Sequence, residues 1–163
     1  MYLGRHGILT TSQGARIGYL SGTYNPTTYA SSTDTVDTLT SPHYTSSSIA
    51  SLFTTKFSDK TPPRIDIFIS YEWPKHVTNK SSSSGTHLPS HILSKGIGLG
   101  SKPVAEIIRK LQPRYAFASS EGVFWEREPW SVRNGGVTRF FGLGHFGNST
   151  KERVKNNNGV ILY

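Results

Sequence analysis

The sequence has 163 residues, a length that suits one domain, and it contains no cysteine, which excludes disulfide bonds and thiolate metal sites. Eighteen Lys and Arg against ten Asp and Glu give a formal charge of +8, which favours contact with nucleic acid, an anionic membrane surface or an acidic protein. No stretch approaches the roughly 18 consecutive apolar residues of a membrane-spanning helix, so we expect no membrane-embedded segment.

The first third of the chain predicts a hairpin, a loop and a helix. Two β-prone runs, Ile8–Thr11 and Arg16–Leu20, flank a Gly-containing connection of hairpin length. The segment Asn25–Ser48 is dominated by Ser and Thr and predicts a surface loop. Apolar residues spaced three or four apart over Ile49–Phe57 predict a helix, with its N-cap among Ser46–Ser48.

The middle of the chain alternates between strands and a helix. The apolar, β-branched run Ile65–Ile69 predicts a strand that is covered on both faces. The polar, Ser- and Gly-rich stretch Lys80–Gly100 predicts a mobile loop. Helical spacing over Val104–Leu111 follows Pro103, which suits a first helical turn, and Tyr115–Ala118 predicts the next strand.

The last third predicts an antiparallel β meander. Val123–Glu128 alternates with a period of two, and Gly136–Leu143 is a second β-prone run beyond the turn Arg133–Gly135. Val160–Tyr163 predicts one more strand. The order hairpin, helix, strand, helix, strand and meander indicates a layered α/β architecture.

Two stretches resemble segments of a known enzyme family. The first, IDIFISYEWP, resembles the segment of lariat debranching enzymes, which are metallophosphoesterases, in which a strand ends in Ser-His-Asp-Trp-Pro, and Tyr71 stands at the histidine position. GSKPVAEIIRKLQPRYAFAS resembles the helix and strand that precede their metal-binding Gly-His-x-His motif, but Ser119–Glu121 follows here without histidine.

Four segments in a fixed order indicate a closer family. LGRHGILTTSQGARIGYLSGTYN, YEWP, LQPRYAFASSEGVFWEREPW and VTRFFGLGHFGN together resemble the N-terminal domain of the CwfJ (CWF19-like) family of debranching-enzyme-associated splicing factors. The resemblance implies that residues 1–163 form part of a layered metallophosphoesterase-like sandwich, here incomplete. The N-terminal βα half of that domain and the family's C-terminal HIT-like domains would lie outside this chain.

The same resemblance implies a noncatalytic role. A two-metal phosphoesterase needs several imidazoles and carboxylates that converge from different strand ends. The six histidines of this chain form no HxH motif, and His87 and His91 are separated by Pro89 in a Ser/Gly-rich stretch. We therefore expect no enzymatic activity and no metal cofactor. The implied function is that of a nuclear domain in pre-mRNA splicing and intron lariat turnover, which binds or activates the lariat debranching enzyme and contacts spliceosomal proteins and RNA.

The candidate contact residues combine aromatic and charged groups. Tyr71, Glu72, Trp73, Pro74 and Lys75 follow a predicted strand, and Trp is common at the centre of interfaces. Further candidates for a partner or RNA are Arg114, Trp125, Arg127 and Arg139, with Arg133 beside them. Core packing is the alternative for the two tryptophans, and a charged sheet edge is the alternative for the arginines.

Two other functions stay open at this point. The chain could be a divergent metal-dependent ribonuclease or phosphodiesterase whose missing ligands lie outside these 163 residues. It could also be a general RNA-binding module, an interpretation that depends on charge and aromatic content alone.

Overall fold

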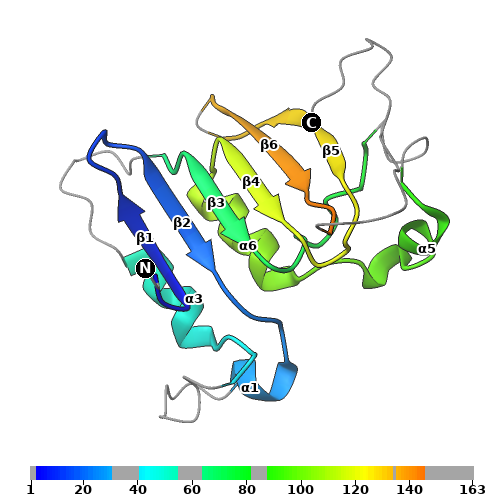
Figure 1. Cartoon of the computed structure of the whole chain (residues 1–163), viewed down its shortest axis with the longest axis horizontal. Helices are drawn as coiled ribbons and strands as arrows, with labels where there is room; N and C mark the ends of the chain where they lie inside the picture. The colour runs from blue at the N-terminus through cyan, green and yellow to red at the C-terminus, as the bar shows by residue number, and fades with distance from the viewer. Residues whose placement is uncertain (1–2, 31–40, 55–63, 82–87, 134, 146–163) are drawn as a thin grey trace.

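The computed structural model describes residues 3–30, 41–54, 64–81, 88–133 and 135–145, which form a mixed α/β structure around one six-stranded sheet (Figure 1). The strands are β1 (His6–Thr10), β2 (Arg16–Leu20), β3 (Ile67–Ser70), β4 (Tyr115–Ala118), β5 (Trp125–Ser131) and β6 (Val137–Gly142). The helices are α1 (Pro26–Ala30), α3 (Ser46–Thr54), α5 (Ser90–Leu93) and α6 (Lys102–Leu111), with a 3₁₀ turn η1 (Gly96–Gly98). No helix in these ranges is long and apolar enough to cross a membrane.

The sheet order is β1-β2-β3-β4-β6-β5. The four inner strands β2, β3, β4 and β6 run parallel, while β1 and β5 pair antiparallel at the two edges. Parallel neighbours need a crossover between them, and the segments containing α3 and α6 supply the crossovers before β3 and β4. The predicted hairpin, the predicted helices and the antiparallel pair near the C-terminal end are confirmed.

Helix α6 forms where its sequence signals are strongest. Ser101 is the N-cap, and its hydroxyl accepts a hydrogen bond from the Val104 N–H at 3.5 Å. Pro103 occupies the first turn, and Val104, Ile107 and Ile108 are buried at helical spacing. The helix ends at Gln112, which adopts the left-handed conformation (φ 48°).

Within the described part of the chain, helices pack on only one face of the sheet. Strand alternation and register place Gly18, Phe68, Ala116 and Phe140 on the covered face, where the buried residues of α3 and α6 pack. On the opposite face Ile69 is 47% exposed. The expectation that Ile65–Ile69 forms a strand covered on both faces is therefore wrong, because both packed helices lie on the same side of the sheet (Figure 1).

Two predicted loops contain ordered core residues. Within Lys80–Gly100 the structure contains α5 and η1, and Leu88 before α5 and Ile92 within it are buried, so the prediction of a mobile loop is wrong over residues 88–100. Within Asn25–Ser48 the structure contains α1, and Tyr44 and Thr45 are buried. Although the composition of these segments is polar, a few apolar or aromatic side chains, Tyr44, Leu88 and Ile92, pack into the core.

Smaller predictions have mixed outcomes. The Thr45 hydroxyl accepts the Ser48 N–H at 3.1 Å, so α3 is capped one residue before the predicted range. The predicted strand Val160–Tyr163 lies outside the described residues. One sheet is present among the described residues, so the layered metallophosphoesterase-like sandwich implied by the family resemblance stays a prediction.

Candidate functional site

The carboxyl ends of the four parallel strands meet at one edge of the sheet, the usual place for functional groups in α/β folds. The loops that follow β3 and β4 are joined there, because the N–H groups of Ser119 and Ser120 both donate to the Tyr71 carbonyl, at 3.0 and 2.8 Å. The Trp73 N–H donates to the Ser120 hydroxyl at 3.2 Å. This set of loop residues, Tyr71–Trp73 and Ser119–Glu121, is called the strand-end site below.

Glu72 is held by hydrogen-bond donors. Its Oε2 accepts the Tyr44 hydroxyl at 2.6 Å and the Tyr24 N–H at 2.9 Å. The Tyr44 hydroxyl also lies 2.6 Å from Ser101 Oγ. Burial and the neighbouring Glu72 raise the pKa of the Tyr44 phenol above its ordinary value, so the phenol stays a neutral donor.

The other carboxylate of the strand-end site is also engaged. Glu121 accepts the Ser120 hydroxyl at 3.1 Å and pairs with Lys95 at 2.5 Å. Among the described residues no group of three or more His, Asp and Glu side chains is arranged to hold a metal ion. The chemistry that these two carboxylates perform in this arrangement is hydrogen bonding between segments.

The two candidate tryptophans lie in the core. Trp73 is 0% exposed and stacks on Trp125, with ring centroids 5.5 Å apart, and Phe140 meets Trp73 edge-on at 5.3 Å. The expectation that Trp73 and Trp125 contact a partner is therefore wrong, because a buried indole offers no surface to a partner. The alternative, core packing, holds for both residues. Pro74 is buried as well, whereas Tyr71 is 49% exposed and Lys75 is partly exposed.

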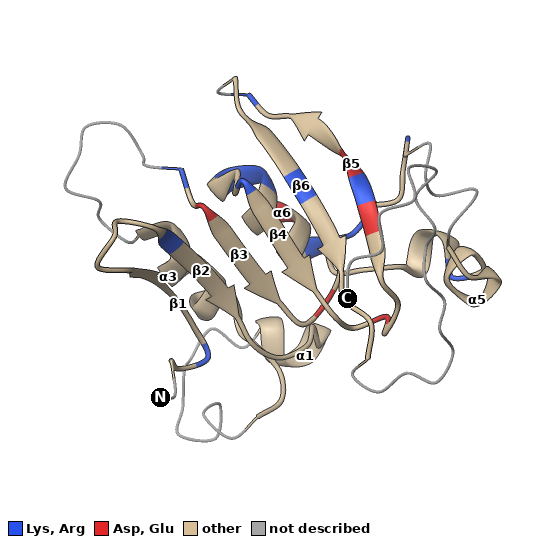
Figure 2. Cartoon of the chain, turned by 45° about the horizontal axis from the view of Figure 1, so that its top comes forward, with Lys and Arg blue, Asp and Glu red and all other residues tan. Residues whose placement is uncertain are grey.

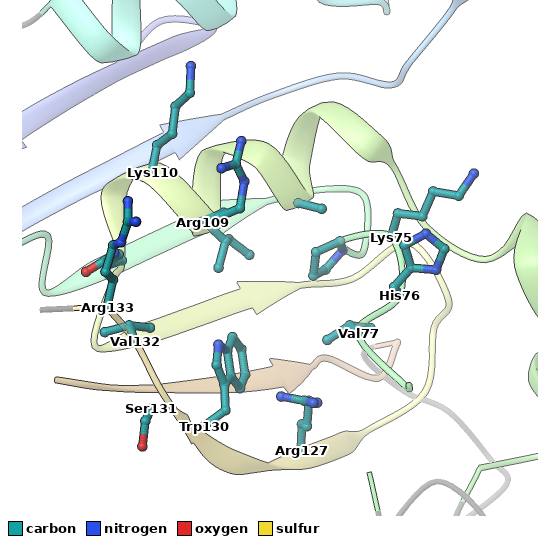
Figure 3. Close-up of a pocket in the computed structure, with 14 residues that line it drawn as sticks. Lys75, His76, Val77, Arg109, Lys110, Arg127, Trp130, Ser131, Val132 and Arg133 are labelled. Atoms are coloured by element: carbon teal, nitrogen blue, oxygen red, sulfur yellow. The ribbon is translucent and has the colours of Figure 1, made fainter. Parts of the chain in front are cut away.

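A cavity lies on the helix side of the sheet, between α6, β5 and the turn after β3 (Figure 3). Its volume is about 810 Å³. Its charged and aromatic lining consists of Lys75, His76, Arg109, Lys110, Arg127, Trp130 and Arg133. We call it the basic cavity.

The structure separates the candidate arginines into two groups. Arg127 and Arg133 line the basic cavity together with Lys75. Arg114 instead pairs with Asp66 at 3.4 Å, and Arg139 is exposed on the uncovered face of the sheet. Figure 2 shows basic positions along α6, β5 and β6.

The sequence patterns did not single out three of the charged and aromatic lining residues, His76, Arg109 and Lys110. Arg109 and Lys110 form the basic last turn of α6. The predicted helix over Val104–Leu111 already places both residues at its C-terminal end, so the sequence contained this signal. Trp130 ends the stretch Phe124–Trp130, in which aromatic and charged groups alternate, but strict alternation along β5 would place it on the face opposite Trp125 and Arg127.

Comparison with known proteins identifies the chain's relatives. It is 34% identical over 164 aligned positions to human CWF19-like protein 1, a match that covers 93% of this chain and 26% of the relative. This chain is a homologue of the CWF19-like proteins. No protein-family model matches it.

Two other relatives extend the CWF19-like similarity. Zinc finger CCCH domain-containing protein 64 of Arabidopsis thaliana is 37% identical over 93 residues, which cover 56% of this chain and 15% of the relative. A lariat debranching enzyme of the same plant is 29% identical over 150 residues, which cover 87% of this chain and 34% of the enzyme. The chain thus spans about a third or less of the length of these relatives.

Proposed function

We propose that this chain is a noncatalytic, metallophosphoesterase-like interaction domain that acts in pre-mRNA splicing and intron lariat turnover. In this proposal it works in the nucleus with spliceosomal proteins and binds or activates the lariat debranching enzyme through the strand-end site. Homology to CWF19-like proteins and the similarity to a lariat debranching enzyme support this role.

The observation that carries the noncatalytic part is the environment of Glu72. An O–H and an N–H group donate to the same carboxylate oxygen, Glu72 Oε2, at 2.6 and 2.9 Å. A cation there would have to displace a donor that is itself buried, and the Tyr71 side chain beside it is a phenol, a poor substitute for an imidazole ligand. The hydrogen bonds of Glu72 are suited to fixing the loop after β3 against the segments that contain Tyr24 and Tyr44.

Tyr71 is the accessible aromatic group of the strand-end site, and it provides the test of partner binding. Full-length protein carrying an affinity tag should recover purified lariat debranching enzyme in the presence of EDTA, and Tyr71→Ala should lower recovery at least about threefold. The matched control is Tyr115→Ala, since Tyr115 has similar exposure, 42%, but lies on the uncovered sheet face. Equal recovery by both variants would remove the strand-end site from the proposal, and no recovery by the wild type would refute the partner.

The second candidate function is a divergent metal-dependent nuclease, which the similarity to the debranching enzyme favours. Purified full-length protein should leave a branched lariat RNA intact with or without Mn²⁺ if the noncatalytic proposal is correct. Cleavage that requires Mn²⁺ and is lost in Glu72→Gln would establish the nuclease instead.

A further inference from the structure

The basic cavity is lined by a concentration of positive charge. Of the described residues that line it, five are Lys or Arg and none is Asp or Glu. The cations come from three separate elements, since Arg109 and Lys110 lie on α6, Lys75 on the turn after β3, and Arg127 and Arg133 on or after β5 (Figure 3). A concentration of like charge around one cavity costs free energy unless an anion compensates for it.

A β-bulge places Trp130 in this cavity. Arg127 pairs with Phe140 and Trp130 pairs with Thr138, so β5 has one more residue than β6 between the two pairs. Phe140 and Thr138 share the covered face of the sheet, and their partners three residues apart on β5 therefore share it too. Pro129, which has no N–H for the ladder, lies within the bulge.

The bulge brings a guanidinium and an indole together. The Arg127 guanidinium carbon lies 4.5 Å from the centre of the Trp130 ring. One of its amino groups donates to the Asn79 carbonyl at 3.1 Å, while the buried Nε has no hydrogen-bond partner among the described residues. A buried donor without an acceptor is costly, and a ligand oxygen in the cavity would satisfy it.

Most of the other cations in the cavity are also available to a ligand. The ion pairs Lys95–Glu121 and Arg114–Asp66 both lie outside the cavity. Lys110 sits 4.1 Å from the centre of the Phe53 ring. Arg109, Arg133 and Lys75 have no ion pair within the described part of the chain.

We propose that the basic cavity is a binding site for single-stranded RNA, in which the cations contact consecutive phosphates and the Arg127–Trp130 pair stacks on an unpaired base. Proteins that bind single strands combine these same two features, a positive groove and aromatic or guanidinium planes. A single free phosphate would use few of the five cations, and bases within a duplex could not reach the recessed indole. The site is separate from the strand-end site, so this proposal does not depend on the debranching enzyme as a partner.

The test is the binding of a fluorescein-labelled 12-nucleotide oligouridylate to the full-length protein, measured by anisotropy over a range of KCl concentrations. Arg109→Glu and Arg133→Glu should each weaken binding at least about fivefold, and each should reduce the salt slope by about 0.7 per lost contact. Arg139→Glu is the control, because it makes the same charge change at an exposed site on the opposite sheet face. An equal loss in all three variants would show a nonspecific charge effect and overturn the proposal.

A second measurement locates the RNA on the protein. A 4-thiouridine-labelled strand, cross-linked with ultraviolet light, should yield an RNA-linked peptide containing Trp130 that is reduced in Arg133→Glu. Cross-links confined to other parts of the protein would refute the site. A competition experiment at matched ionic strength compares inorganic phosphate and a phosphoserine peptide with unlabelled oligouridylate. If either displaces the labelled RNA at a lower concentration than oligouridylate does, the cavity binds a free anion or a phosphopeptide instead.

Discussion

Tyr44 shows how one side chain connects three segments of this protein. Its hydroxyl lies 2.6 Å from both Glu72, in the loop after β3, and Ser101, the N-cap of α6. Tyr44 is 2% exposed, and its hydrogen bond with Ser101 is buried, whereas the one to Glu72 is partly buried. Removing the hydroxyl would leave the partly buried Glu72 carboxylate with one donor fewer, which costs about 1–3 kcal/mol.

The raised pKa of Tyr44 makes its contribution dependent on pH. The folded state keeps the phenolic proton above the ordinary pKa of 10.0, whereas the unfolded chain loses it. The contribution of Tyr44 to the free energy of unfolding is therefore fully present below pH 10. Above pH 10 it falls by at most about 1.4 kcal/mol per pH unit. Tyr44→Phe should be less stable at pH 8 and should lose less stability between pH 10 and 11.5 than the wild type, as measured by urea unfolding with circular dichroism. Parallel pH curves for the two proteins would contradict this assignment.

At the scale of elements, close packing between β6 and the turn after β3 holds the core together at the strand-end site. Trp73 lies directly against Gly142, the last residue of β6. A Cβ at Gly142 would overlap indole carbon Cζ2 and lie 2.8 Å from Cε2. The indole cannot move aside easily, because Trp125 and Phe140 enclose it.

Gly142→Ala should therefore destabilise the fold by about 2–3 kcal/mol through overpacking, measured as a shift in the urea midpoint. Gly98→Ala is the matched control, because a Cβ there meets no atom within 4 Å. Equal midpoints for the two variants would show that the Trp73 contact with β6 is not tight.

At the scale of the whole molecule, the uncovered face of the sheet is the most prominent feature. Its apolar residues include Ile67, Ile69, Tyr115, Phe117 and Phe141, and the last two stack with ring centroids 5.3 Å apart. Contiguous apolar patches of this kind promote association in water.

The 163-residue chain should therefore self-associate at tens of micromolar, and Ile69→Lys should reduce the associated fraction in sedimentation velocity. Ile97→Lys is the control, because Ile97 is 86% exposed but lies on η1, away from this face. A reduction by Ile97→Lys as large as that by Ile69→Lys would indicate a general charge effect.

The sequence alone determined the local elements. Apolar spacing and end signals predict the helix that the structure shows at Lys102–Leu111, and the turn at Arg133–Gly135 predicts the antiparallel pair of β5 and β6. These features depend on contacts between near neighbours, which the chain order fixes directly. The four quoted segments also indicated the family, which the comparison with CWF19-like protein 1 confirms.

Only the tertiary structure decided which side chains are available for binding. Trp73 and Trp125 looked like contact residues, but packing across β3, β5 and β6 buries them. The bulge in β5 turns Trp130 toward Arg127, and α6 brings Arg109 to the same cavity. Burial and the meeting of distant residues depend on how elements pack and pair in register, and local periodicity carries no information about either.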